Sequence, residues 1–271
     1  TRPEVRISRM RVEATGLPTV NSHHFLHLRD LRQILSEERL DRRLRVLELG
    51  AGDGVQTAAL RELFDEVTPI DPVPYGDVDG MVVADAADLP FEDDSFDLIF
   101  SSNVLEHVRQ LNDAFDEMKR VLAPGGIMIH SMPTGTWKIV QLVGRPFASV
   151  LKIFRRLIPG VSAHSGRVKL GGSFDADSSG ETLRSMVRRI IGLVIPTIHG
   201  VSGNHVSEFV RFRPRWWERR FERAGFDCYR TSPLFFHSPY DLLPYRFMAL
   251  RDFAGRTGFA SVDVFWLRGN S

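Results

Sequence analysis

The pattern of apolar and polar positions predicts an α/β chain. Val46, Leu47 and Leu49 form the kind of apolar run that a parallel strand covered on both faces requires. Residues 57–64 follow with apolar side chains at helical spacing. The same rhythm continues, predicting strands at 66–71, 80–85, 95–102 and 127–132 and helices at 103–108 and 112–122. Strands that alternate with helices in this way predict a doubly wound sheet.

A glycine-rich turn joins the first predicted strand to the first predicted helix. Glycines 50, 52 and 54 carry no Cβ, so the backbone can adopt positive φ and a ligand can lie against it. Glu48 precedes the turn, where a carboxylate would repel a pyrophosphate but suit a cationic or hydroxyl-rich ligand. Asp71 ends the second predicted strand about 20 residues after the first glycine, where a ribose diol is usually bound. The pattern favours a nucleoside ligand with positive character.

Composition and charge narrow the class of protein. With 271 residues, 43% of them apolar, the chain can form one domain plus an elaboration. The net charge of +1 hides an asymmetry between two parts of the chain. Residues 45–134 hold 18 acidic and 5 basic residues, whereas residues 135–223 hold 6 acidic and 16 basic residues. This split predicts two functional surfaces. Cys228 is the single cysteine, which excludes an intramolecular disulfide and fits a cytoplasmic location. We expect no signal peptide or spanning segment within the given residues, which begin at Thr1 rather than at a methionine.

The motifs of residues 45–134 together resemble the class I S-adenosylmethionine-dependent methyltransferases, specifically the small-substrate group often called type 11. In chain order they are Glu48–Gly54, Asp71, Asp85 with Asp88–Phe91, Phe96–Ile99, Val104–His107 and Lys119–Gly126. The resemblance implies a Rossmann-like, seven-stranded, mostly parallel sheet with an antiparallel last strand. A helical lid inserted after the fifth strand is where we expect this chain to depart from a minimal enzyme of the family. It also implies S-adenosylmethionine as methyl donor and S-adenosylhomocysteine as product.

The resemblance further implies how the donor is bound. Gly50 and Gly52 would lie along its methionine and ribose portion, with Glu48 near its ammonium group. Asp71 would accept hydrogen bonds from both ribose hydroxyls, which suits the two oxygens of a carboxylate.

The remaining donor contacts implied by the resemblance come from the third and fourth strands. Asp85 would bind the exocyclic amine of adenine, with the backbone of Ala86 beside it. Ser102 and Asn103, at the mouth of the fourth strand, would lie by the sulfonium. The alternative for Asp71 and Asp85 is that each is a solvated turn carboxylate.

The chain divides into four segments. We expect an N-terminal helical lead-in at 1–44 with a helix over 24–39, a donor-binding core at 45–134, a helical insert or lid at 135–209, and a C-terminal helix and strands at 210–271 that complete the core. An insert after the fifth strand lies over the carboxyl end of the sheet, so it should close the acceptor pocket.

Within the insert, residues 137–143 and 149–158 have the pattern of basic amphipathic helices. One interpretation is that residues 137–158 contact an anionic membrane or a lipid-linked acceptor, which would place the protein peripherally at the inner membrane face. The alternative is that the apolar stripe packs on the domain or on a second copy in a homodimer, with the basic groups solvated.

Methyl transfer from a sulfonium depends mainly on positioning, and a general base is needed only for a weak nucleophile such as an alcohol. His107, on the predicted helix after the fourth strand, is the nearest candidate base in the core. The resemblance offers an alternative, since Leu-Glu-His is a recurring family element that can simply cap or pack.

A second set of candidate catalytic residues lies in the insert. His199, His205 and Glu208 fall in a loop expected to face the donor, a composition that suits a base with an orienting acid. The alternative is that they are solvated loop residues. The loop and the Trp216-Trp217 segment after it also resemble, more weakly, methyltransferases of bacterial polysaccharide biosynthesis.

We expect no metal site. His23, His24 and His27 are close in sequence, but no carboxylate or cysteine at ligand spacing completes a set.

These features favour O-methylation of a sugar, glycan or glycolipid hydroxyl. The alternative enzyme is a C-methyltransferase acting on a lipid or quinone-like small molecule, and the alternative of another class is a non-catalytic donor-binding interaction protein. Nucleic acid is not an expected partner, because Ser102-Asn103-Val104-Leu105 stands where amino-directed nucleic-acid methyltransferases carry an Asn-Pro-Pro-Tyr loop.

Overall fold

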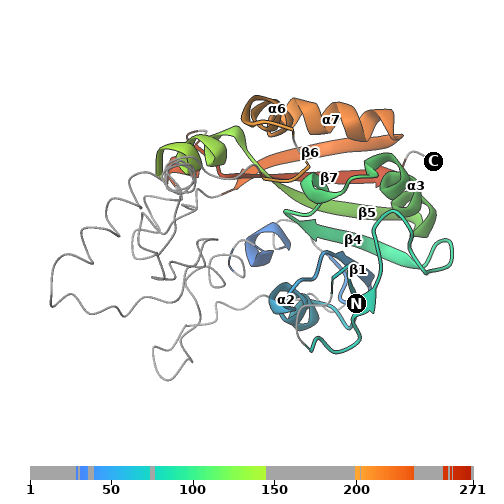
Figure 1. The fold of residues 1–271 in the computed structure, drawn as a ribbon. Coiled ribbons are helices and arrows are strands. Elements are labelled where there is room, and N and C mark those ends of the chain that lie inside the picture. The colour runs from blue at the N-terminus through green and yellow to red at the C-terminus, as the bar shows by residue number, and fades with distance from the viewer. Residues whose placement is uncertain are drawn as a thin grey trace, which may run out of the picture.

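A seven-stranded sheet forms the centre of the protein (Figure 1). The computed structural model describes residues 29, 31–35, 40–73, 77–144, 199–201, 203–234, 253–255, 257 and 259–269. The strands are β1 (Arg45–Leu49), β2 (Glu66–Asp71), β3 (Val82–Val83), β4 (Phe96–Ser102), β5 (Leu122–Pro133), β6 (Phe226–Leu234) and β7 (Val262–Gly269), in the order β3-β2-β1-β4-β5-β7-β6. Strands β1 to β5 pair in parallel, and β7 is antiparallel to both β5 and β6. The predicted doubly wound sheet with an antiparallel last strand is therefore confirmed.

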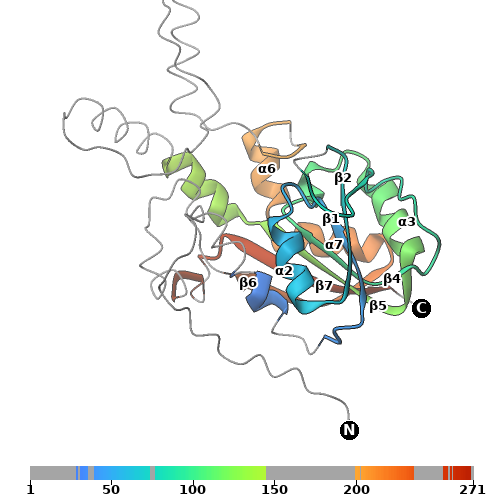
Figure 2. The ribbon, with the colours of Figure 1, turned by 90° about the horizontal axis from the view of Figure 1, so that it is seen from below.

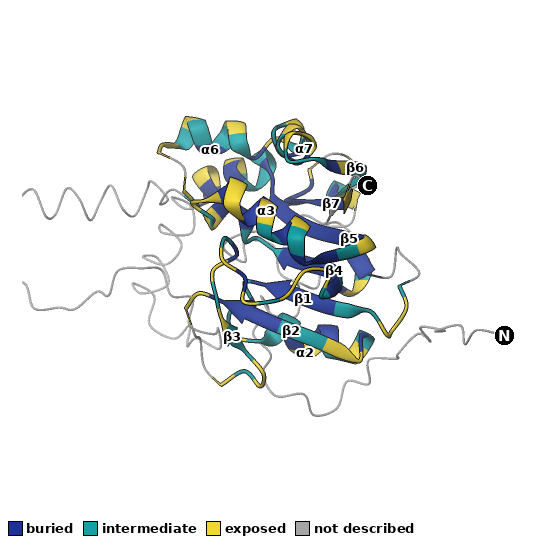
Figure 3. Ribbon diagram, turned by 90° about the vertical axis from the view of Figure 1, so that its right-hand side faces the viewer, coloured by how far each residue is buried: buried dark blue, intermediate teal, exposed yellow. Residues whose placement is uncertain are grey.

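Helices cover both faces of this sheet. The named ones are α2 (Val55–Leu63), α3 (Leu111–Val121), α6 (His205–Arg211), α7 (Pro214–Arg223) and the 3₁₀ turn η1 (Leu105–His107), and residues 31–35 and 135–144 are also helical. Because side chains alternate along a strand, Leu47 packs in the cluster formed with α3 and α7, whereas Val46 packs in the cluster formed with α2 and residues 31–35. Figure 2 shows α2 beside residues 31–35. In Figure 3 the central strands are mostly buried between the helices, whose outer surfaces are exposed.

Two elements are shorter than the sequence predicts. The strand expected at 80–85 is only Val82–Val83, since it pairs with β2 at the sheet edge and Asp85 then forms a tight turn with Asp88. The helix expected at 103–108 is the single turn η1, because Asn103 adopts a left-handed φ of 54° and Val108 is already extended. The chain therefore leaves β4 as a tight turn, which brings the segment after it close to the glycine turn.

The boundary between the helix expected at 112–122 and the strand expected at 127–132 is also different. Helix α3 ends at Val121 and β5 begins directly at Leu122, with a register shift on β4 between Phe96 and Leu98. The register shift lies at the N-terminal end of β5, away from the carboxyl edge of the sheet.

The helix predicted at 149–158 lies outside the described residues. The predicted helix over 24–39 is described only at residue 29 and residues 31–35, which are helical. Within the described part of the chain, no helix combines the length and the apolar character needed to cross a membrane.

Candidate active site

The glycine turn joins β1 to α2 at the carboxyl edge of the sheet. Gly50, Gly52 and Gly54 have φ of 70°, 58° and 77°, a region that favours glycine. A Cβ on Gly50 would lie 2.4 Å from a methyl carbon of Val104, so this glycine allows the turn to contact the segment after β4. A Cβ on Gly52 would meet no atom within 4 Å. The turn is therefore closed at Gly50 and open to a ligand at Gly52.

Asp71, at the end of β2, is fixed beside this open position. Its Oδ2 accepts a hydrogen bond of 3.0 Å from the backbone N–H of Gly52, and its Oδ1 accepts one of 2.9 Å from Val73. The residue is 8% exposed. Since a carboxylate oxygen has two lone pairs, each oxygen can accept one more hydrogen bond.

Glu48 is buried at 1% exposure in β1 and is only half satisfied. Its Oε2 accepts a 2.6 Å hydrogen bond from the Thr57 hydroxyl of α2, while its buried Oε1 has no hydrogen-bond partner in the described part of the chain. Burial raises the pKa of this carboxyl to about 7. A proton or a ligand cation would satisfy the second oxygen.

The other predicted donor contacts lie along the same edge. Asp85 is exposed and its Oδ1 accepts the N–H of Ala87 at 2.9 Å, whereas Ala86 is buried. The Ser102 hydroxyl accepts a 2.9 Å bond from Ser131, and Asn103 donates its N–H to the Ser131 carbonyl at 2.8 Å. Because the carboxyl ends of parallel strands lie at the same edge of a sheet, these groups lie along the same edge as the glycine turn.

Two of the predicted catalytic histidines meet just beyond β4. His107 and His199 are 92 residues apart in the chain, yet their Nε2 atoms lie 3.2 Å from each other. Oε1 of Glu106 lies 3.4 Å from Nε2 of His199 and 3.9 Å from Nε2 of His107. We call Glu106, His107 and His199 the histidine–glutamate cluster.

This cluster is held by backbone contacts. The N–H of Val201 donates to the Glu106 carbonyl at 2.9 Å, and a Cβ on Gly200 would lie 2.4 Å from that carbonyl oxygen. Gly200 thus permits the loop that carries His199 to lie directly on η1. His107 is about half exposed, and its partial burial lowers the pKa of its imidazole. The cluster is therefore fixed on one side and open on the other.

Glu208, also a candidate, lies behind the cluster rather than in it. It is fully buried on α6 and forms an ion pair of 2.6 Å with the fully buried Nζ of Lys138. Its Oε1 accepts the N–H of His199 at 3.0 Å, and Nδ1 of His205 lies 3.5 Å from its Oε2. This arrangement suits a residue that positions His199, since the carboxylate does not reach the surface. His205 is partly exposed and lies outside the cluster.

Lys138 corrects one sequence-based interpretation. The sequence places it on a basic amphipathic helix able to face a membrane, but residues 135–144 direct it inward, where Nζ also donates to Oε1 of Gln141 at 2.9 Å. It is the one basic side chain of residues 137–143, so that stretch has no free charge for an anionic surface.

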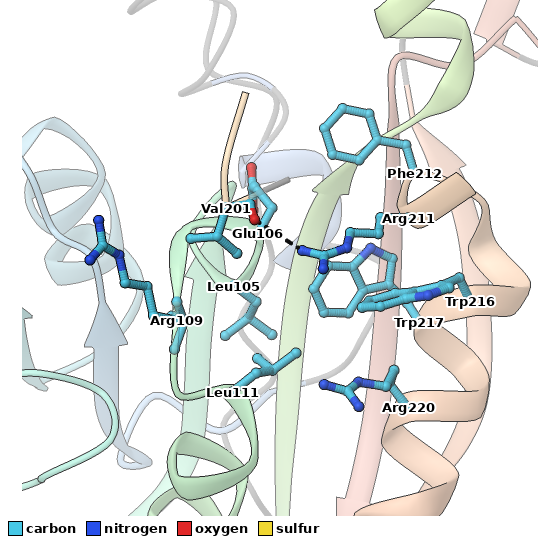
Figure 4. Close-up of a pocket in the computed structure, with 11 residues that line it drawn as sticks. Leu105, Glu106, Arg109, Leu111, Val201, Arg211, Phe212, Trp216, Trp217 and Arg220 are labelled. Carbon is cyan, nitrogen blue, oxygen red and sulfur yellow. Dashed lines mark hydrogen bonds between the residues drawn. The ribbon is translucent and has the colours of Figure 1, made fainter. Parts of the chain in front are cut away.

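A pocket of about 380 Å³ begins at Glu106 and runs along α7 (Figure 4). Three arginines and three aromatic side chains contribute to its walls: Arg109, Arg211, Arg220, Phe212, Trp216 and Trp217. The guanidinium groups of Arg211 and Arg220 lie 5.7 and 5.4 Å from the Trp216 ring centre. The sequence analysis did not identify this pocket. Its signal was an arginine five residues before Trp216 and another four residues after it, a spacing equally typical of a solvated helix.

A sheet ordered 3-2-1-4-5-7-6, with a glycine turn after its first strand and acids at the ends of β1 and β2, defines the fold of class I S-adenosylmethionine-dependent methyltransferases. In agreement, residues 47–130 match the family described as Methyltransferase domain. The chain contains a class I methyltransferase domain, and the methyl donor of its family is S-adenosylmethionine.

Curated relatives share this domain with different acceptors. The chain is 35% identical over 158 residues to a demethylmenaquinone methyltransferase of Clavibacter sepedonicus, which covers 53% of this chain and 63% of the relative. It is 37% identical over 100 residues to a malonyl-acyl-carrier-protein O-methyltransferase of Methylococcus capsulatus, covering 32% and 36%. The chain thus spans less than two thirds of the length of either relative.

Solved structures show the same fold at low sequence identity. A chain of the complex between the Haloferax volcanii Trm112 methyltransferase activator and a methyltransferase has a TM-score of 0.53 at 15% identity, covering 92% of both chains. The 4+2 cyclase SpnF has a TM-score of 0.50 at 15% identity, covering 89% of this chain and 80% of that one. Because a cyclase and a methyltransferase share it, the fold alone does not determine the reaction.

Proposed function

We propose that this protein binds S-adenosylmethionine at the glycine turn and transfers its methyl group to a hydroxyl of a small acceptor. The observation that carries the proposal is the position of the histidine–glutamate cluster. Gly50 packs on Val104, the residue before η1, and η1 carries Glu106 and His107. Groups that can remove or stabilise a proton therefore lie next to the turn that would hold the donor.

The environments of two carboxylates support the donor site. Asp71 is fixed beside Gly52 with one free acceptor position on each oxygen, which suits two ribose hydroxyls. Oε1 of Glu48, which is buried and has no hydrogen-bond partner among the described residues, suits the ammonium of the methionine portion.

The other donor contacts follow the order of the strands. In this proposal Asp85 and Ala86 contact adenine, since both follow β3, and Ser102 and Asn103 flank the sulfonium at the end of β4.

The reaction follows from the chemistry of the donor. The acceptor oxygen attacks the methyl carbon in line with the breaking carbon–sulfur bond, and S-adenosylhomocysteine leaves as a neutral thioether. The acceptor hydroxyl must lose its proton, and the histidine–glutamate cluster is the place where it can do so. Glu208 contributes by holding the backbone of His199.

The pocket favours an acceptor that carries a negative charge. Arg109, Arg211 and Arg220 contribute to its walls, and guanidinium groups bind phosphate and carboxylate through paired N–H donors. Its volume of about 380 Å³ fits a small ring with one charged group. A sugar phosphate, an acidic glycan or a phosphate-linked glycolipid has this character and also supplies hydroxyl groups.

A second candidate function is C-methylation of a quinone-like molecule. It is favoured by the similarity to the demethylmenaquinone methyltransferase and by the aromatic walls of the pocket at Phe212, Trp216 and Trp217. A carbon acceptor of this kind would not need the cluster for activation. Substitution of His199 therefore separates the two candidates.

The test is to incubate the protein with S-adenosylmethionine and either anionic sugars and glycolipids or reduced naphthoquinones. S-adenosylhomocysteine and the methylated product are then measured by mass spectrometry. We expect a sugar-class product whose formation is lost in His199→Gln. Methylation of the quinones alone would favour the second candidate. Donor binding with no turnover on either class would favour a non-catalytic binding protein.

A further inference from the structure

The histidine–glutamate cluster has the dimensions of a metal site. Its three potential ligand atoms are Oε1 of Glu106 and Nε2 of His107 and His199, separated by 3.2, 3.4 and 3.9 Å. Two ligands bound tetrahedrally to zinc at about 2.0–2.1 Å lie about 3.3 Å from each other. One ion can therefore contact all three atoms with small side-chain movements.

A second observation concerns the carboxylate itself. The Glu106 side chain is 3% exposed, and neither of its buried oxygens has a hydrogen-bond donor in the described part of the chain. Such a carboxylate is costly to bury unless a cation or a donor satisfies it. The two histidine nitrogens that face each other are in addition the atoms through which imidazole binds metals.

We propose that Glu106, His107 and His199 bind one divalent transition-metal ion. Two imidazoles and one carboxylate form a ligand set that suits zinc, iron, manganese or cobalt better than magnesium, which prefers oxygen ligands alone. The half-exposed side of His107 leaves room for further ligands from solvent or substrate.

The support around the cluster fits this assignment. The His199 backbone N–H is held by Glu208, whose charge is compensated by the buried Lys138. Val201 and Gly200 fix the same loop on the Glu106 carbonyl. A metal site needs ligands held in position by such outer contacts.

The ion would have a specific role in the reaction. That role rests on the proposed function, whereas binding of the ion does not depend on it. A hydroxyl bound to a divalent metal has a lowered pKa, so the acceptor would release its proton to solvent and keep its oxygen on the ion. That oxygen would then form the new O–CH₃ bond while the carbon–sulfur bond of the donor breaks. The pocket that begins at Glu106 would present the acceptor to the ion.

The test is titration of Co²⁺ and Zn²⁺ into the full chain, prepared without a histidine tag and freed of metal with a chelator. Binding is measured by calorimetry and, for Co²⁺, also by visible absorption. We expect one ion per chain. Loss of a residue that only supports a metal ligand lowers metal affinity by about 10–100-fold. Because Glu106→Gln, His107→Gln and His199→Gln each remove a ligand itself, each should lower the affinity for the ion by at least that much.

Two controls locate the site. His205→Gln changes a nearby histidine outside the cluster, and a triple variant of His23, His24 and His27 to Gln removes the other close group of histidines in the sequence. Both should keep the ion, and all variants should keep S-adenosylhomocysteine binding as proof of folding.

Three outcomes would contradict the proposal. They are absence of ion binding in the wild type, binding unchanged in His199→Gln, and binding lost in the triple variant. Failure of the proposed methyltransferase function would give results different from failure of the metal site. Ion binding without methyl transfer to any acceptor would support the site and contradict the proposed function, while methyl transfer unaffected by removal of the ion would contradict the ion's role alone.

Discussion

The three carboxylates expected at the donor site occupy different environments, so we expect them to contribute unequally. Among the residues that the structure describes, Glu48 is buried with one unsatisfied oxygen, Asp71 is held by two backbone N–H groups, and Asp85 is exposed and closes its own turn. Asp71 has the geometry that depends least on rearrangement when a ligand arrives.

Asp71→Ala should weaken S-adenosylmethionine binding by about 1–3 kcal/mol, or about 5–150-fold, because charged hydrogen bonds to the ribose are lost. Calorimetric titration measures the change. Asp116→Ala removes an exposed carboxylate from α3 and should have no effect. Equal affinities for wild type and Asp71→Ala would contradict the assignment of the ribose site.

Glu48 should make the ligand-free protein less stable as pH rises. Burial raises its folded pKa to about 7 from the ordinary value of 4.5, so between these values the folded state keeps a proton that the unfolded state has lost. The free energy of unfolding should therefore fall through this window by up to about 3 kcal/mol and level off above it.

Urea unfolding at pH 5 and pH 8 measures this effect, and Glu48→Gln should remove it. Asp263, whose pKa is also raised to about 7 by burial, contributes equally to the pH dependence of the wild type and of Glu48→Gln. The difference between the two pH dependences therefore reports Glu48 alone. An identical pH dependence in the two proteins would show that Glu48 is ionised in the folded state.

At the scale of elements, the glycine turn and η1 form the junction between the donor site and the cluster. Gly52 and Gly125 make a matched pair, because both have positive φ and neither would place a Cβ within 4 Å of another atom. Alanine at either position should cost about 1–2 kcal/mol of stability from backbone strain.

Only Gly52→Ala should also impair donor binding, since its Cβ enters the space beside Asp71. Thermal unfolding measures the shared loss of stability, and calorimetric titration measures the difference in affinity. Similar donor affinities in Gly52→Ala and Gly125→Ala would show that the ligand does not lie along this backbone.

The buried Lys138–Glu208 pair joins helical residues 135–144 to α6. Lys138→Met leaves a buried carboxylate uncompensated and should destabilise the protein by about 3–5 kcal/mol, as measured by urea unfolding. Adding Glu208→Gln should recover part of this loss, because a neutral amide oxygen can still accept the His199 N–H. Failure of the second substitution to recover any stability would contradict a charge-based explanation.

Local pattern explains which elements could be predicted. The apolar runs of β1 and β4 are strong signals because these strands are buried along most of their length. The helical spacing of α3 is a strong signal because its buried residues share one face, and the positions of all three elements agree with the structure. The edge strand β3 pairs at only two positions and could not be delimited from its sequence. His107 and His199 were identified as polar candidates, but their contact depends on a loop 92 residues away in the chain, which local pattern does not encode.

At the scale of the whole molecule, the carboxyl edge of the parallel strands gathers every proposed functional group. The glycine turn, Asp71, the histidine–glutamate cluster and the pocket along α7 are contributed by segments that lie far apart in the chain, from Gly50 to Arg220. Since SpnF shows that this fold also hosts cyclase chemistry, the reaction must be established from the site rather than from the sheet.

Calorimetric titration of S-adenosylmethionine and S-adenosylhomocysteine into the purified full chain is therefore the first measurement to make. We predict one site per chain with a dissociation constant on the order of micromolar for both ligands. No heat of binding for either ligand, from a protein shown to be folded by circular dichroism, would contradict the donor site and with it the methyltransferase function.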